Sequence, residues 1–251
     1  MKILSLGWGV QSFTMAAMVA LGKLEPVDFA IHSDTGHESQ LTYVFAERWT
    51  PWLEERGVKV ITVKGIDENP IIDKYGGCMI PTYTEKGQSN RQCTKEWKIM
   101  PQRRWITNEL KRQGLTKTES VIEMWIGIST DEWCRSRISD VKYIKNRYPL
   151  LELGMSRKDC KKFLLDNGLE VPTKSSCVFC PFHAKVNWQA VKAVDADWEK
   201  AVEVDRLVRN VPNKPTLWVH NSRIPLEEVD LRTPEEMGQM HLSESCSECW
   251  L

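Results

Sequence analysis

Short apolar runs alternate with amphipathic stretches along the first half of the chain. Apolar runs of four to eight residues bounded by turn residues are typical of buried strands, and apolar residues recurring every three to four positions indicate helices. Strands are predicted at residues 2–6, 27–32, 58–63 and 121–128, and helices at residues 11–21, 39–56 and 95–113. Pro51 predicts a kink or break late in the second helix. This order predicts an α/β fold with an open, mostly parallel sheet flanked by helices.

The second half is less regular. Residues 66–94 are rich in Gly, Pro, Asn and Thr, which predicts a long loop with room for a hairpin. A helix capped by Ser156 is predicted to end before Gly168, and a helical pattern returns at residues 184–209. The chain after residue 210 is irregular. We predict one α/β domain at residues 1–150 and a helical, cysteine-bearing part at residues 151–251.

Charge and composition limit the classes of function. The chain has 34 basic and 34 acidic residues, so binding of nucleic acid must be local or shared with partner proteins. No apolar run approaches 18 residues and no leader pattern opens the sequence, which predicts a cytoplasmic protein with no membrane partner. A local basic run could face a phosphate backbone: Arg103, Arg104, Lys111, Arg112, Arg135, Arg137, Lys142, Lys145 and Arg147.

The stretch SLGWGVQS, residues 5–12, joins the first predicted strand to the first helix. Gly7 and Gly9 allow the backbone to approach a phosphate, and the helix start offers free N–H groups. A Walker loop lacks its Lys here, and a dinucleotide fingerprint lacks its third glycine where Ser12 stands. A turn that only packs strand on helix is the alternative. The stretch resembles the pyrophosphate loop (PP-loop), Ser-Gly-Gly-x-Asp-Ser, of N-type ATP pyrophosphatases and PAPS reductases, with Gln11 replacing the family's acid.

Three further segments resemble the same superfamily, in chain order. They are SDTGHE at residues 33–38, RQCTKEWKIMP at residues 91–101 and GISTDEWCRSR at residues 127–137. The resemblance covers roughly residues 1–180 and implies an adenine nucleotide alpha-hydrolase-like fold that binds ATP and Mg²⁺. It implies catalytic roles for Gln11, Ser12, Asp34 and Arg135. It implies nucleotide contacts from Ser5, Gly7, Trp8, Gly9, Val10, Gln11, Ser12, Asp34, Thr35, Gly127, Arg135 and Arg137. The alternatives are a helix-capping Asp34 and a solvated basic loop.

Cysteines form a second group of candidate residues. Cys177 and Cys180 have Cys-x-x-Cys spacing, which lets two thiolates face one metal or cluster, and the tail adds Cys246 and Cys249. The two pairs could hold a structural Zn²⁺. The resemblance instead favours a [4Fe–4S] cluster on Cys93, Cys177, Cys180 and Cys246, with Cys249 as the alternative fourth ligand. Three other cysteines are expected to be ordinary buried thiols: Cys78, Cys134 and Cys160.

The resemblance implies an ATP pyrophosphatase that activates its substrate by adenylation and releases pyrophosphate. With an iron–sulfur cluster, the expected task is sulfur incorporation into nucleic acid, as in DNA phosphorothioation or tRNA thiolation, with a cysteine desulfurase as sulfur donor. One alternative is a sulfonucleotide reductase that acts on PAPS or APS and uses Cys246 or Cys249 as nucleophile. Another is a non-catalytic nucleotide-binding adaptor with a zinc site.

Overall fold

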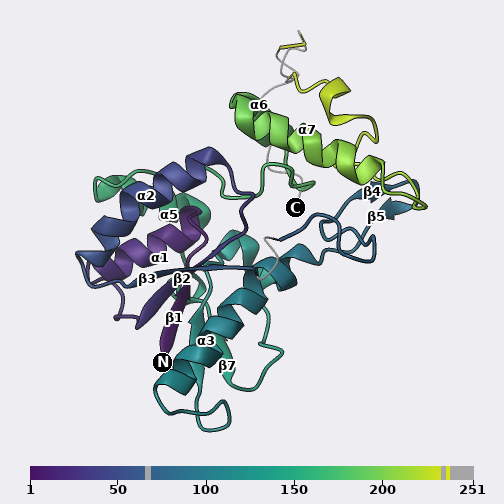
Figure 1. Ribbon diagram of the computed structural model, residues 1–251. Coiled ribbons are helices and arrows are strands. Elements are labelled where there is room, and N and C mark those ends of the chain that lie inside the picture. The colour runs from purple at the N-terminus through teal and green to yellow at the C-terminus, as the bar shows by residue number, and fades with distance from the viewer. Residues whose placement is uncertain (66–68, 233–235, 238–251) are drawn as a thin grey trace. The chain divides into compact units, whose positions relative to one another are not determined.

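The computed structural model of the chain describes residues 1–65, 69–232 and 236–237 (Figure 1). It divides into two compact units, Met1–Pro70 with Arg91–Cys177, and Ile71–Asn90 with Val178–Leu251. The boundary lies elsewhere than at residue 150. Residues 151–177 belong with the first unit, because α5 (Arg157–Asp166) packs against α1 (Val10–Ala20). Residues 71–90 belong with the second.

The first unit contains a five-stranded parallel sheet of order β3-β2-β1-β6-β7. Its strands are β1 (Lys2–Ser5), β2 (Phe29–Asp34), β3 (Val60–Lys64), β6 (Ile122–Trp125) and β7 (Ile144–Arg147). The predicted open parallel sheet is therefore confirmed. Because β1 pairs with β2 on one side and with β6 on the other, the direction of winding reverses at β1.

Helices cover both faces of this sheet (Figure 1). α1, α2 (Gln40–Glu54) and α5 pack on one face, around a cluster that includes Phe13, Phe45 and Leu164. α3 (Met100–Arg112) packs on the other face, around Ile31, Ile106 and Ile122. Short elements complete the unit: the π-helix η1 (Thr94–Ile99), the 3₁₀ helix η2 (Thr130–Arg135) and α4 (Pro149–Glu152).

The structure differs from the predicted elements in four places. β7 was not expected, because its sequence Ile-Lys-Asn-Arg is mostly polar, as an edge strand allows. α2 continues through Pro51 without a break. The helix expected at 95–113 begins with π geometry before α3. The pattern at 184–209 gives two helices, α6 (Lys185–Lys192) and α7 (Asp195–Arg209).

The second unit is built from the predicted loop and the C-terminal part. The loop contains a hairpin of β4 (Tyr83–Thr84) and β5 (Gly87–Gln88), and Tyr83 also pairs with Trp218. Buried Asp205 of α7 accepts hydrogen bonds from the backbone N–H groups of Val219 and Leu226, before η3 (Leu226–Glu228). Among the helices that the structure describes, none is long and apolar enough to span a membrane.

Candidate nucleotide site

The glycine loop, residues 6–9, lies between β1 and α1 at the reversal point of the sheet. Ligands of open α/β sheets bind past the carboxyl ends of strands at such a point. Gly127, just after β6, lies against the start of α1. A Cβ atom at Gly127 would be 2.9 Å from the backbone nitrogen of Ser12 and 3.2 Å from the carbonyl carbon of Gln11. The structure thus brings Gly127 and the glycine loop together, as the sequence predicts.

Trp8 has an unusual position for a residue of a ligand loop. Its φ of 54° is left-handed, and its side chain is only 2% exposed. The indole ring lies 6.3 Å, between ring centroids, from each of Phe13, His32 and Phe45. The ring is therefore a core anchor, and in this structure it is not available to stack on a base.

Hydroxyl groups hold the glycine loop in shape. Ser12 Oγ accepts the Gly7 N–H at 3.1 Å and donates to the Gly9 carbonyl at 3.2 Å, while Ser175 donates to the Gly7 carbonyl. Gly9 is the N-cap of α1, and no side chain in the described part of the chain caps this helix start. The positive end of α1 is thus left for a ligand, with Val10 buried beneath it. Ser5, at the end of β1, accepts a hydrogen bond from Gln102.

Gln11, which stands where the resembled family has an acid, is buried in a polar network. Its amide nitrogen donates to Ser129 Oγ at 3.3 Å and to Glu132 Oε2 at 3.2 Å. Its amide oxygen accepts from Arg157 at 3.0 Å. Because an amide both donates and accepts, Gln11 can join an acid to a base, whereas a carboxylate would repel Glu132. Glu132 and Arg157 were not singled out from the sequence.

The two arginines expected to clamp an anion are differently engaged. Arg135 pairs with Glu132 at 2.7 Å, so it belongs to the Gln11 network. Arg137 donates through its guanidinium to the carbonyls of Cys134 and Ser136 at 2.7 Å and 2.9 Å, and its backbone N–H donates to Tyr148 Oη. The structure therefore places Arg135, but not the Arg137 guanidinium, in hydrogen-bonded contact with the network around the glycine loop.

The acidic turn, residues 34–38, follows β2 at the same edge of the sheet. Asp34 Oδ1 accepts from the Gly36 N–H at 2.8 Å and from Tyr43 Oη at 2.9 Å, and Lys64 lies 3.5 Å from Oδ2. Burial raises the pKa of Asp34, but these hydrogen bonds and the lysine charge outweigh it and hold the pKa below its usual value. Asp34 is thus a stable carboxylate.

Glu38 closes the acidic turn and was not singled out from the sequence. Its side chain is 1% exposed, and Oε1 accepts from Lys98 of η1 at 3.0 Å. Burial lowers the pKa of Lys98, but the charges of Glu38 and Cys177 outweigh it and raise that pKa. Within the described residues Oε2 of Glu38 has no hydrogen-bond partner, and the same holds for Thr94 Oγ1 and Trp97 Nε1 on η1. Buried polar atoms of this kind are common where water or a ligand binds.

The cysteines are spread over the chain. Cys93 and Cys177 are partly exposed in the first unit, where the Thr35 hydroxyl lies 3.7 Å from the Cys177 sulfur. Cys180 belongs to the second unit, and Cys246 and Cys249 lie outside the described residues. In the part of the chain that the structure describes, no three His, Cys, Asp or Glu side chains lie together as a metal-binding group. The described residues therefore do not assemble the cluster, which stays a prediction.

The remaining thiols were expected to be buried, and this is correct only for Cys160. Burial raises the pKa of the Cys160 thiol to about 11. The prediction is wrong for Cys134, which is exposed because it lies on the surface turn η2, and Cys78 is partly exposed.

Comparison with known proteins gives one likeness. No family model matches the sequence, and no curated protein matches it. Among solved structures the chain is similar to a phosphoadenylyl-sulfate (PAPS) reductase from Candida auris in a phosphate complex. The identity is 16%, the match covers 68% of this chain and 74% of that chain, and the TM-score is 0.45. At this identity the likeness assigns no role to any residue.

Proposed function

We propose that the chain is an ATP pyrophosphatase that adenylates a substrate and serves sulfur incorporation into nucleic acid. The observation that carries the proposal is the glycine loop at the reversal point of the sheet, beside a helix start that no side chain in the described residues caps. Backbone N–H groups there can bind a phosphate chain, and Gly127 allows the neighbouring strand end to lie close to them.

The residues around the loop suit a phosphate ligand that reacts. N–H groups fixed at a helix start stabilise negative charge that develops on phosphate oxygens, without needing to reorganise. Asp34 is ionised, and among the described residues its Oδ2 contacts only Lys64 within ion-pair distance. That oxygen would hold Mg²⁺ or accept a ribose hydroxyl proton. Mg²⁺, when bound, neutralises charge on the departing pyrophosphate.

The Gln11 network would act on the geometry of the loop. Gln11 joins the first turn of α1 to Glu132 and Arg157, so the phosphate loop and the segment after β6 are held as one body. Arg135 reaches this body through Glu132. Its remaining guanidinium N–H groups would be donors to a bound phosphate.

A second candidate function rests on the same residues. The glycine loop carries no carboxylate of its own, which suits a reaction that needs no metal ion. A sulfonucleotide reductase fits this description. In that reaction a cysteine thiolate attacks the sulfur of PAPS or APS, and a second thiol releases sulfite by forming a disulfide. The nucleophile would be Cys246 or Cys249.

The [4Fe–4S] cluster on Cys93, Cys177, Cys180 and a tail cysteine, with a cysteine desulfurase as sulfur source, completes the proposed sulfur chemistry. Zinc on the two cysteine pairs is the competing occupant and would fit an adaptor without turnover. Anaerobic purification of the full chain followed by iron and zinc analysis separates the two. Iron supports the sulfur-transfer proposal, and zinc without iron contradicts it.

The decisive experiment measures two products from one preparation. Pyrophosphate release from ATP and Mg²⁺ supports the first function, and thiol-dependent sulfite release from PAPS or APS supports the second. Asp34→Asn should lower pyrophosphate release about tenfold or more, because the carboxylate near the phosphates is lost. The matched control is Asp140→Asn, an exposed acid that pairs with Arg103. Equal activity of both variants, or neither product from the native chain, would contradict the proposal.

A further inference from the structure

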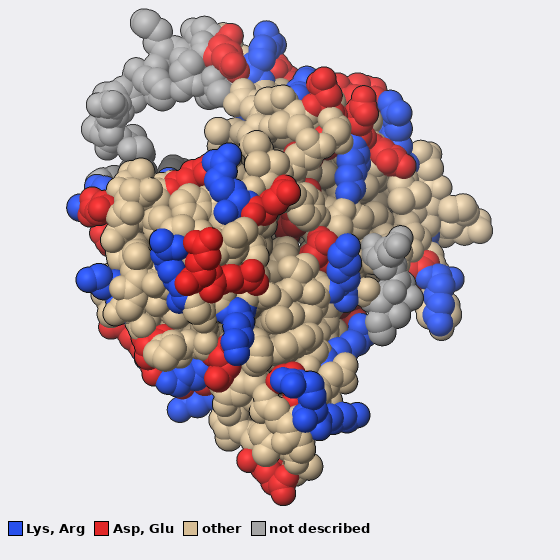
Figure 2. Space-filling model, turned by 60° about the vertical axis from the view of Figure 1, so that its left-hand side comes forward, with Lys and Arg blue, Asp and Glu red and all other residues tan. Residues whose placement is uncertain are grey.

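The basic run seen in the sequence separates into paired and unpaired cations in the structure. Lys and Arg side chains lie among Asp and Glu side chains on the face in Figure 2. Four of the nine cations form ion pairs: Arg103 with Asp140, Arg112 with Glu109, Arg135 with Glu132, and Arg147 with Glu25, Glu123 and Glu152. Five make no ion pair with the described residues: Arg104, Lys111, Arg137, Lys142 and Lys145.

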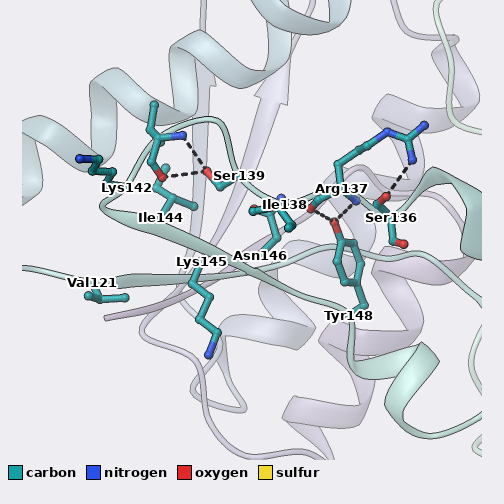
Figure 3. Close-up of a pocket in the computed structure, with 11 residues that line it drawn as sticks. Val121, Ser136, Arg137, Ile138, Ser139, Lys142, Ile144, Lys145, Asn146 and Tyr148 are labelled. Atoms are coloured by element: carbon teal, nitrogen blue, oxygen red, sulfur yellow. Dashed lines mark hydrogen bonds between the residues drawn. The ribbon is translucent and has the colours of Figure 1, made fainter.

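Three of these five unpaired cations line one groove beside the edge strand β7 (Figure 3). The groove has a volume of about 570 Å³, and Arg137, Lys142 and Lys145 are its charged residues. No acidic side chain of the described residues lines it. The groove also presents two apolar side chains, Ile138 with 97% and Val121 with 65% of its surface exposed. It is therefore positively charged with apolar contact points.

The walls of the groove are held by hydrogen bonds within the protein (Figure 3). Tyr148 Oη accepts the Arg137 N–H at 2.8 Å and donates to the Arg137 carbonyl at 2.6 Å. Asn146 donates to the same carbonyl at 2.8 Å. Ser139 bonds both to the carbonyl and to the N–H of Val141. These bonds fix residues 136–139 against β7, so the groove is formed before a ligand arrives.

The groove begins next to the candidate nucleotide site. Ser136, which lines it, directly follows η2. Within η2, Glu132 accepts a hydrogen bond from Gln11 at the start of α1. A long ligand in the groove would therefore have one end near the segment that contacts the phosphate loop.

We infer that this groove binds the phosphodiester backbone of a nucleic-acid strand and leads the strand toward the nucleotide site. The inference rests on the proposed function, in which the adenylated acceptor is a nucleic acid. Arg137, Lys142 and Lys145 contact phosphates, and Ile138 and Val121 contact sugars or bases. Three unpaired cations without a lining acid complement a polyanion, and the exposed apolar side chains suit the unpaired bases of a single strand better than a duplex.

The test measures binding of fluorescently labelled single-stranded DNA and RNA by anisotropy, over a series of salt concentrations and without nucleotide. The variant Lys142→Gln/Lys145→Gln should bind about tenfold more weakly, because two phosphate contacts and their released counterions are lost. The slope of log affinity against log salt should fall by roughly 2. Arg137→Gln should weaken binding further. The strand that binds more tightly identifies DNA or RNA as the natural class.

The matched control is Lys111→Gln/Lys161→Gln, which removes the same charge from exposed lysines of α3 and α5, outside the groove. This control should bind as the native chain does. Equal weakening by both variants, no strand binding by the native chain, or equal competition by an acidic peptide would overturn the inference.

Failure of the inference and failure of the proposed function give different results. Pyrophosphate release is measured without a strand, and strand binding is measured without ATP. Turnover with strand binding that ignores the groove variants overturns the groove alone. Strand binding that needs the groove lysines, without pyrophosphate or sulfite release, overturns the enzymatic proposal and supports the groove.

Discussion

The glycine loop and the acidic turn end neighbouring strands at the same edge of the sheet, yet they use opposite parts of the chain. The glycine loop directs its large side chain, Trp8, into the core and leaves backbone groups to face a ligand. The acidic turn keeps its functional atoms on side chains, Asp34 and Glu38, each held by a lysine. We expect substitutions in the first to act through packing, and substitutions in the second to act through charge.

The largest effect should come from removing the anchor of the glycine loop. Trp8→Ala should lower the free energy of unfolding by about 3–5 kcal/mol, because it leaves a large cavity among Phe13, His32 and Phe45. Urea denaturation measures the change. Trp133→Ala is the control, since Trp133 is exposed and should cost less than about 0.5 kcal/mol. If both variants lose the same stability, the description of the loop as a packed anchor is wrong.

The close approach of Gly127 to α1 gives the next largest effect. Gly127→Ala should cost about 1–3 kcal/mol of stability, because the added methyl group meets backbone atoms that cannot easily move. It should also weaken binding of a nucleotide at the loop, measured by calorimetry. Gly7→Ala is the stability control, because a Cβ at Gly7 meets its nearest atom only at 3.8 Å. A Gly127 variant as stable as the Gly7 variant would contradict the close packing.

The two lysine–acid pairs of the acidic turn should respond unequally. Lys98→Met leaves the almost fully buried Glu38 without its hydrogen-bond donor and should cost about 1–2 kcal/mol. Lys64→Met removes an exposed lysine 3.5 Å from Asp34 and should cost less than about 0.5 kcal/mol. Thermal or urea unfolding compares them. Equal losses would show that burial of Glu38 does not govern the pair.

The smallest effect concerns His32, which links the two regions because its Nδ1–H donates to the Leu6 carbonyl. Burial lowers the pKa of His32 and outweighs the Glu38 charge and the Leu6 bond, which raise it. The unfolded chain therefore binds the proton more readily than the folded chain, and stability falls as the pH drops below about 6.5.

Replacing His32 by Gln keeps a donor for Leu6 and removes the titration. The difference in unfolding free energy between about pH 7.5 and about pH 5.5 should be smaller in His32→Gln than in the native chain. An unchanged difference would show that the buried ring does not contribute to acid sensitivity.

Local pattern predicted much of the fold because β1 and β2 are apolar and lie inside the sheet. It missed β7, because an edge strand with Lys145 and Arg147 has no apolar run. The glycines located the ligand loop, but they carried no information on the inward ring of Trp8. That orientation follows from the positive φ and the packing of residues distant in the sequence.

Pairing between distant residues could not be predicted for the same reason. Gln11 meets Glu132 and Arg157, which are 121 and 146 residues away in the chain. The sequence likewise showed nine cations in one run, but it could not show that acids as distant as Glu25 neutralise some of them. Burial of Glu38 against Lys98 arises from the meeting of β2 with η1.

The two-part composition of the second unit has a consequence for synthesis on the ribosome. Residues 71–90 emerge early, but the partner of Tyr83 is Trp218, to which it donates and from which it accepts a backbone hydrogen bond. At usual elongation rates the hairpin β4–β5 waits on the order of ten seconds for that partner. During this interval the first unit can complete its sheet, while the hairpin remains a nascent segment exposed to chaperones and proteases.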